Sequence, residues 1–113
     1  MGVKVRNNKL YINMEGDIDH HGASILREES DVVFNREYIK EVIFDFANIK
    51  FMDSSGIGLI MGRYRQAKYN DAKVSLINVP DNVDRMLEMS GIYRIIDNVE
   101  KKNNKISKCQ GEK

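Results

Sequence analysis

One short segment, Val42-Ile43-Phe44-Asp45-Phe46, constrains the fold of this chain most strongly. Nearly all of its side chains are apolar, whereas a strand with one solvated face alternates apolar and polar residues. A run of this length and kind suits an inner strand of a sheet that is covered on both faces. The segment therefore indicates a layered protein in which other elements pack against a central sheet.

The spacing of apolar residues on either side of this segment predicts further strands and helices. Alternation with period two favours strands, and a spacing of three or four residues favours helices. In chain order we expect a hairpin over residues 3–14 that turns at Asn7-Asn8, a helix from about His21 to Asn35 capped by Asp19, the inner strand, a connector from Asn48 to Ser55, a helix from about Gly56 to Asn70, a strand from Lys73 to Val79, and a helix between Pro80 and Gly91. This order predicts an α/β layer with helices packed on the sheet.

Composition and charge narrow the class of protein. The 113 residues fit a single domain, which we place at residues 1–98, followed by a polar C-terminal tail at 99–113 that we expect to be solvated and open to disorder. A net charge of +1 gives no attraction to nucleic acid or membrane. The single cysteine, Cys109, forms no internal disulfide, and no apolar stretch reaches the roughly 20 residues of a membrane span. We therefore expect a cytoplasmic protein.

The segment from Phe51 to Gly58 carries the candidate chemistry. Asp53, Ser54 and Ser55 lie between a buried segment and the start of a predicted helix, where free backbone N–H groups and the helix dipole tolerate an anion. Gly56 and Gly58 would leave room for another protein to approach the hydroxyl groups. The simpler alternative is that one of the three polar residues only caps the helix.

Enzymatic readings of this segment are weaker. It lacks the Gly-x-Ser-x-Gly of a nucleophile elbow, the Lys-Ser/Thr pair of a phosphate-binding loop and the third glycine of a dinucleotide site. His20-His21 has no further histidine to complete a metal site, so a hydrogen-bonding or interface role is favoured. We predict no catalytic residues, no metal site and no cofactor.

The same segment resembles a known family. Met52 to Gly58, continuing into Gly62-Arg63-Tyr64, closely resembles the phosphorylation segment of bacterial anti-sigma factor antagonists, which belong to the STAS-domain family. Gly16 to His21 resembles a second family segment and Met89 to Ile92 a third, in consistent order over about residues 3–97. The motifs Asp19-His20-His21 and Gly62-Arg63-Tyr64 are most similar to those of the sporulation branch of the family, which antagonises the anti-sigma F factor.

The resemblance implies a fold and a set of site residues. The fold would be a STAS-like single α/β domain, with a mixed β-sheet and helices packed mainly on one face. Ser54 would be the phosphoacceptor, and Ser55 would be its helix-capping neighbour. The expected partner-binding residues are Asp17, Asp19, His20, Met52, Asp53, Ser55 and Gly56.

The resemblance also implies a partner-switching function rather than an enzyme. The unphosphorylated chain would bind an anti-sigma factor that is also a serine kinase and so release the sigma factor for sporulation-specific transcription. Phosphorylation of Ser54 would switch the chain off, and a metal-dependent serine phosphatase would reverse it. A first alternative is an antagonist in a general stress-response sigma cascade. A second, from another class, is a small nucleotide-binding or hydrolytic α/β domain.

Two sets of side chains remain to be placed. Methionine at helical spacing is more often core than surface, and we expect Met52 and Met89 to be the exceptions that lie at a binding surface. Arg63 and Arg65 are predicted to be solvated charges on the second helix.

Overall fold

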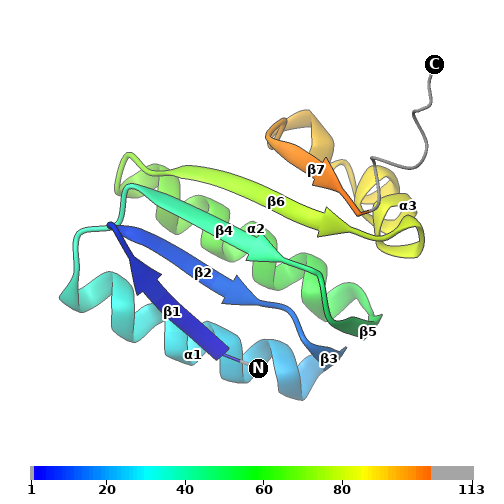
Figure 1. The fold of residues 1–113 in the computed structure, drawn as a ribbon, viewed down its shortest axis with the longest axis horizontal. Coiled ribbons are helices and arrows are strands. Elements are labelled where there is room, and N and C mark those ends of the chain that lie inside the picture. The colour runs from blue at the N-terminus through cyan, green and yellow to red at the C-terminus, as the bar shows by residue number, and fades with distance from the viewer. Residues whose placement is uncertain (1, 103–113) are drawn as a thin grey trace.

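The structure, a computed structural model, describes residues 2–102 (Figure 1). Along the chain its elements are β1 (Gly2–Arg6), β2 (Lys9–Asn13), β3 (Gly16–Ile18), α1 (His20–Arg36), β4 (Glu41–Asp45), β5 (Ile49–Met52), α2 (Ser54–Tyr69), β6 (Lys73–Val79), α3 (Asp81–Ser90), the 3-10 turn η1 (Ile92–Arg94) and β7 (Val99–Lys101). Among these elements, no helix has the length and apolar character needed to cross a membrane.

The main sheet has five strands in the order β1-β2-β4-β6-β7. Strand β1 runs antiparallel to β2, and every other neighbouring pair is parallel. The antiparallel pair is the expected hairpin, with Asn7 and Asn8 at φ values of +55° and +64° in its turn. Asparagine tolerates this left-handed conformation better than most residues. The mixed sheet predicted for the chain is confirmed.

Helices α1 and α2 lie side by side on one face of the sheet (Figure 1). The core forms between this face and the helices. The buried side chains there alternate along β2, β4 and β6 and recur at helical spacing on α1 and α2: Leu10, Ile12, Val42, Phe44, Val74, Leu76, Ala23, Leu26, Leu59 and Ile60. Packing of helices mainly on one face is therefore also confirmed.

The central strand β4 differs from the expectation in one respect, because helices do not cover both of its faces. Ile43 points away from Val42 and Phe44, yet it is only 7% exposed. Its register neighbours Tyr11 and Ser75 lie beside it on β2 and β6 and shield it. An inner strand can therefore be apolar on a face that flanking side chains alone protect.

Three short strands were not predicted. Residues Asn48 to Ser55 were expected to be a connector, but Ile49–Met52 forms β5 and pairs in parallel with β3. Strand β7 lies within the predicted tail and pairs with β6, so the folded chain extends past the boundary expected at residue 98. Residues 103–113 of that tail lie outside the described residues.

The helix boundaries lie within two residues of those expected. Asp19 caps α1, as predicted. Pro80 precedes α3 in an extended conformation, and Gly91 ends it at a φ of +87°. Glycine is favoured at that position because a Cβ atom would be strained in the left-handed region.

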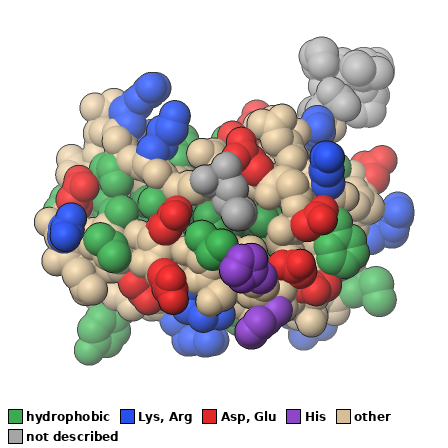
Figure 2. Space-filling view, turned by 90° about the horizontal axis from the view of Figure 1, so that it is seen from below, with side chains coloured by type: hydrophobic (Ala, Val, Ile, Leu, Met, Phe, Trp, Pro, Cys, Tyr) green, Lys and Arg blue, Asp and Glu red, His purple; other side chains and the backbone are tan. Residues whose placement is uncertain are grey.

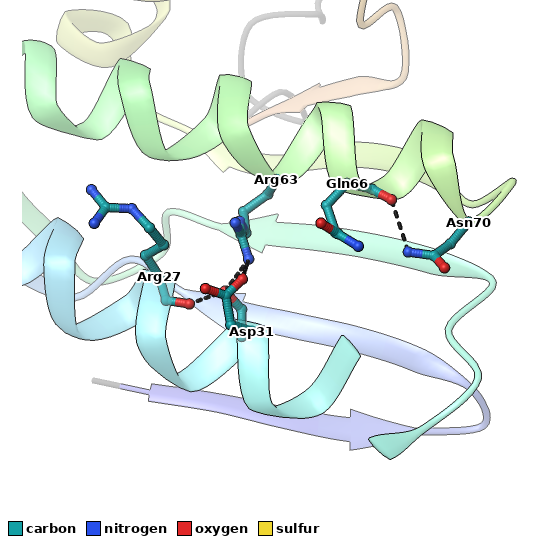
Figure 3. Close-up of polar contacts among 6 residues, drawn as sticks. Arg27, Asp31, Arg63, Gln66 and Asn70 are labelled. Atoms are coloured by element: carbon teal, nitrogen blue, oxygen red, sulfur yellow. Dashed lines mark hydrogen bonds and ion pairs between the residues drawn. The ribbon is translucent and has the colours of Figure 1, made fainter. Parts of the chain in front are cut away.

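Arg63 corrects a prediction, because it is a buried link between two helices rather than a solvated charge. Its side chain is 8% exposed and points from α2 toward α1 (Figure 3). The guanidinium donates to Ser30 Oγ at 3.1 Å and pairs with the carboxylate of Asp31. It also lies 5.8 Å from the ring centroid of Phe34. Arg65, two residues later, is exposed as expected.

Replacing Arg63 therefore tests the contact between α1 and α2. Arg63→Ala should lower the free energy of unfolding by about 2 kcal/mol, because it removes charged hydrogen bonds and buried side-chain packing. The matched variant Arg65→Ala should change it by less than about 0.5 kcal/mol. Urea unfolding measures both values, and equal effects of the two substitutions would contradict the buried link.

Asp84 in α3 holds together the last three elements. The Tyr93 hydroxyl donates to Asp84 Oδ1 at 2.6 Å, and Lys101 Nζ in β7 lies 2.9 Å from Asp84 Oδ2. Burial acts to raise the pKa of Asp84, but the hydrogen bonds from Tyr93 and Lys101 outweigh it and lower that pKa. The carboxylate is therefore charged at neutral pH and joins α3, η1 and β7.

This network predicts an acid-dependent contribution to stability. The pKa of Asp84 is lower in the folded protein than in the unfolded chain, so its stabilising effect is full above about pH 4 and is lost as the pH falls through the folded-state pKa. Asp84→Asn should lower the free energy of unfolding by about 1 kcal/mol near neutral pH. The difference from wild type should shrink below about pH 4. Urea unfolding at both pH values tests this, and a constant difference would disprove it.

Candidate functional site

The pairing of β3 with β5 brings the starts of two helices together. In the parallel register Asp17 pairs with Phe51 and Ile18 with Met52, and the Asp53 N–H donates to the Ile18 carbonyl at 3.3 Å. The chain then enters α1 from β3 and α2 from β5. The N-termini of both helices therefore lie at one end of the molecule, beside the carboxyl ends of the two strands (Figure 1).

Both helices begin with the same local structure. Asp19 and Asp53 are the N-cap residues, with closely similar extended backbone angles. Asp19 Oδ1 accepts from the Gly22 N–H at 3.0 Å, and Asp53 Oδ1 accepts from the Ser55 N–H at 2.8 Å. The residue that caps α2 is thus Asp53. The expectation that Ser55 is the cap is wrong, since Ser55 supplies only a backbone donor.

Ser54 is the first residue of α2, and its side chain is exposed. Because Asp53 makes the capping hydrogen bond, the Ser54 hydroxyl is not needed to cap the helix. His20 holds the equivalent first position of α1 and is also exposed. A group attached to Ser54 would lie next to the positive end of the α2 dipole, where a negative charge is favourable.

Two of the predicted partner-binding residues are buried instead. Met52 is 3% exposed and belongs to the core, so the expectation that it lies at a binding surface is wrong. Gly56 is buried above it: a Cβ atom there would lie 2.3 Å from Met52 Cγ and 2.5 Å from Met52 Sδ. Met52 and Gly56 therefore form the buried side of the site. Gly58 has open space around it, which leaves the approach to this turn of α2 free.

The exposed part of the site is acidic. Asp17 and Asp19 are exposed, and Asp53 is partly exposed. The Gly22 N–H lowers the pKa of Asp19, so this carboxylate is charged at neutral pH. Figure 2 shows acidic side chains on one side of the two histidines and basic side chains on the other. An additional negative group here would therefore strengthen an already negative surface.

Sequence reasoning missed one exposed residue of this region. Phe51 is 50% exposed, although it belongs to a strand that was expected to be a connector. Strand alternation provides the signal in retrospect, since Met52 points inward and Phe51 must then point outward. Met89, in the last turn of α3, is 87% exposed, so its expected place outside the core is confirmed.

Comparison with curated proteins identifies similar chains. The chain is 32% identical to an anti-sigma F factor antagonist of Paenibacillus polymyxa over 87 residues, which cover 77% of this chain and 74% of that protein. It is 28% identical to an anti-sigma-B factor antagonist of Bacillus subtilis (strain 168) over 95 residues, with 84% and 85% coverage.

Comparison with solved structures supports the fold. The chain superimposes on the unphosphorylated form of the anti-sigma factor antagonist SpoIIAA with a TM-score of 0.78, at 23% identity and with 98% and 96% coverage of the two chains. The STAS-domain family profile matches residues 1–106. Because this profile matches nearly the whole chain, the chain belongs to the STAS-domain family.

Proposed function

We propose that this chain is an anti-sigma factor antagonist that works by partner switching in the cytoplasm. Its unphosphorylated form binds an anti-sigma factor that is also a serine kinase, and this binding releases the sigma factor. Phosphorylation of Ser54 ends the interaction, and a metal-dependent serine phosphatase restores it. The similarity to anti-sigma factor antagonists supports the general role.

One observation supports Ser54 as the proposed phosphoacceptor. Its hydroxyl is exposed at the first position of α2, while Asp53 makes the capping hydrogen bond with the Ser55 N–H. A kinase can therefore approach a hydroxyl that has no assigned structural role. The kinase supplies ATP, Mg²⁺ and the phosphoryl-transfer chemistry, and this chain supplies only the acceptor.

The electrostatics favour a switch at the surface. A phosphate adds roughly −1.5 to −2 charges. The N-terminus of α2 tolerates that charge, so the fold survives. The carboxylates of Asp17, Asp19 and Asp53 lie at the same end of the molecule, so the phosphate makes a strongly negative surface there. Repulsion and bulk then prevent the partner from docking.

The stronger similarity supports the sigma F system as the first candidate target of this chain. The relative with 32% identity acts on the anti-sigma F factor, which supports a role in sporulation-specific transcription. The relative with 28% identity acts in a sigma-B system, and it covers more of this chain, so a stress-response cascade is the second candidate. Binding assays against the anti-sigma F and anti-sigma-B factors of the source organism distinguish the two.

The site assignment predicts a simple pattern of phosphorylation. With the anti-sigma kinase and Mg-ATP, wild type and Ser55→Ala should each gain one phosphate on Ser54, whereas Ser54→Ala should gain none and still bind the kinase. Fragment mass spectrometry locates the phosphate. Phosphate on Ser55 would overturn the assignment, and ATP turnover by this chain alone would favour the nucleotide-hydrolysing alternative.

The surface switch makes a separate prediction about stability. Phosphorylation of Ser54 should leave the helix content unchanged and shift the melting temperature by no more than about 5 °C, roughly 1 kcal/mol for a domain of this size. Circular dichroism of both forms measures these quantities. Loss of helical signal, or a much larger drop in melting temperature, would instead indicate a switch by unfolding.

A further inference from the structure

We propose that Phe51 is the apolar anchor of the surface through which this chain docks on its kinase. The inference rests on the proposed function, and it adds a contact with the partner besides Ser54. Six large hydrophobic side chains are exposed among residues 2–102: Val32, Tyr38, Phe51, Tyr69, Met89 and Ile95. Phe51 is the one that belongs to the β3–β5 pair, immediately before the phosphoacceptor turn.

The alternation of side chains along β5 fixes the direction in which the Phe51 side chain points. Met52 and Ile18 are register partners, and both are buried in the core. Phe51 and Asp17 are the preceding register pair, and both are exposed on the opposite face. The phenyl ring therefore stands on the outer face of the two-stranded sheet, beside a carboxylate. Asp17 provides no apolar partner, so half of the ring remains in contact with water.

The surroundings of Phe51 have the composition of a protein-binding surface. Aromatic residues are enriched at the energetic centre of such interfaces, and polar residues form the rim. Here the acidic residues Asp17, Asp19 and Asp53 and the Ser54 hydroxyl follow Phe51 along the chain or across the β3–β5 pair. Figure 2 shows hydrophobic side chains next to acidic ones at this end of the molecule.

The same surroundings indicate the kind of partner. Only two residues, Met52 and Asp53, separate Phe51 from Ser54, so a kinase that reaches Ser54 covers Phe51 as well. The half-exposed ring fits a docking surface with an apolar pocket at its centre and polar groups at its edge. The occupant is therefore the anti-sigma kinase itself, and phosphorylation of Ser54 places new negative charge at the edge of this anchor.

Substitution of Phe51 tests the anchor against a matched control. Tyr69 is an aromatic residue with 90% exposure in the last position of α2, about 22 Å along the helix from Ser54. Phe51→Ala should weaken binding to the kinase that phosphorylates the wild-type chain by about 10- to 100-fold. It should also raise the KM of this chain as a kinase substrate while kcat stays the same. Tyr69→Ala should leave both unchanged.

Stability controls separate the anchor from a structural role. Because Phe51 is half exposed, the melting temperature of Phe51→Ala should stay within about 5 °C of wild type. If it does not, Phe51→Leu keeps apolar bulk in the strand and should give a smaller loss of binding with a normal melting temperature. Binding within about twofold of wild type by a folded Phe51 variant overturns the inference and leaves the proposed function intact. A wild-type chain that neither binds nor accepts phosphate overturns both.

Discussion

The parallel pairing of β3 with β5 is the constraint on which the functional end of this molecule depends. These strands have three and four residues and form a two-stranded sheet of their own. Their register sets Ile18 beside Met52, and both side chains are buried. Two helices then start from adjacent strand ends, each capped by an aspartate. The position of Ser54 is thus set by the β3–β5 pair, which the buried side chains of Ile18 and Met52 hold against the core.

In this part of the molecule, the position of a residue in the strand or in the helix decides whether it faces the core, caps the helix or is exposed. Met52 and Gly56 make the inward contact, Asp53 satisfies the helix start, and Ser54 stays exposed. A phosphate at that point changes the surface charge while the inward contacts remain. This arrangement agrees with the proposed switch, in which the fold is the same in both states and the docking surface changes.

The sequence predicts the large elements well because their signals extend over many residues. The hairpin turn at Asn7-Asn8, the cap at Asp19 and the end of α3 at Gly91 agree with the structure. Strands β3, β5 and β7 were missed because three or four residues show too little alternation to be recognised, and their partners are distant in the chain.

The errors at the site have a similar cause. Helical spacing cannot show that Ser30 and Asp31 of α1 lie opposite Arg63, so a buried arginine was mistaken for a solvated one. Met52 was placed at the surface because the strand that turns it inward was not recognised. The proposal of Ser54 as the phosphoacceptor came from resemblance, and the exposure of its side chain came from the structure.

Displacement of the sigma factor is the direct test of a switch at Ser54. A fluorescently labelled sigma factor is bound to its anti-sigma kinase, and this chain is then added either unphosphorylated or phosphorylated on Ser54. We predict that the unphosphorylated chain releases the sigma factor, whereas the phosphorylated chain leaves the complex intact at the same concentration. Equal release by both forms, or release by neither, would contradict a switch at Ser54.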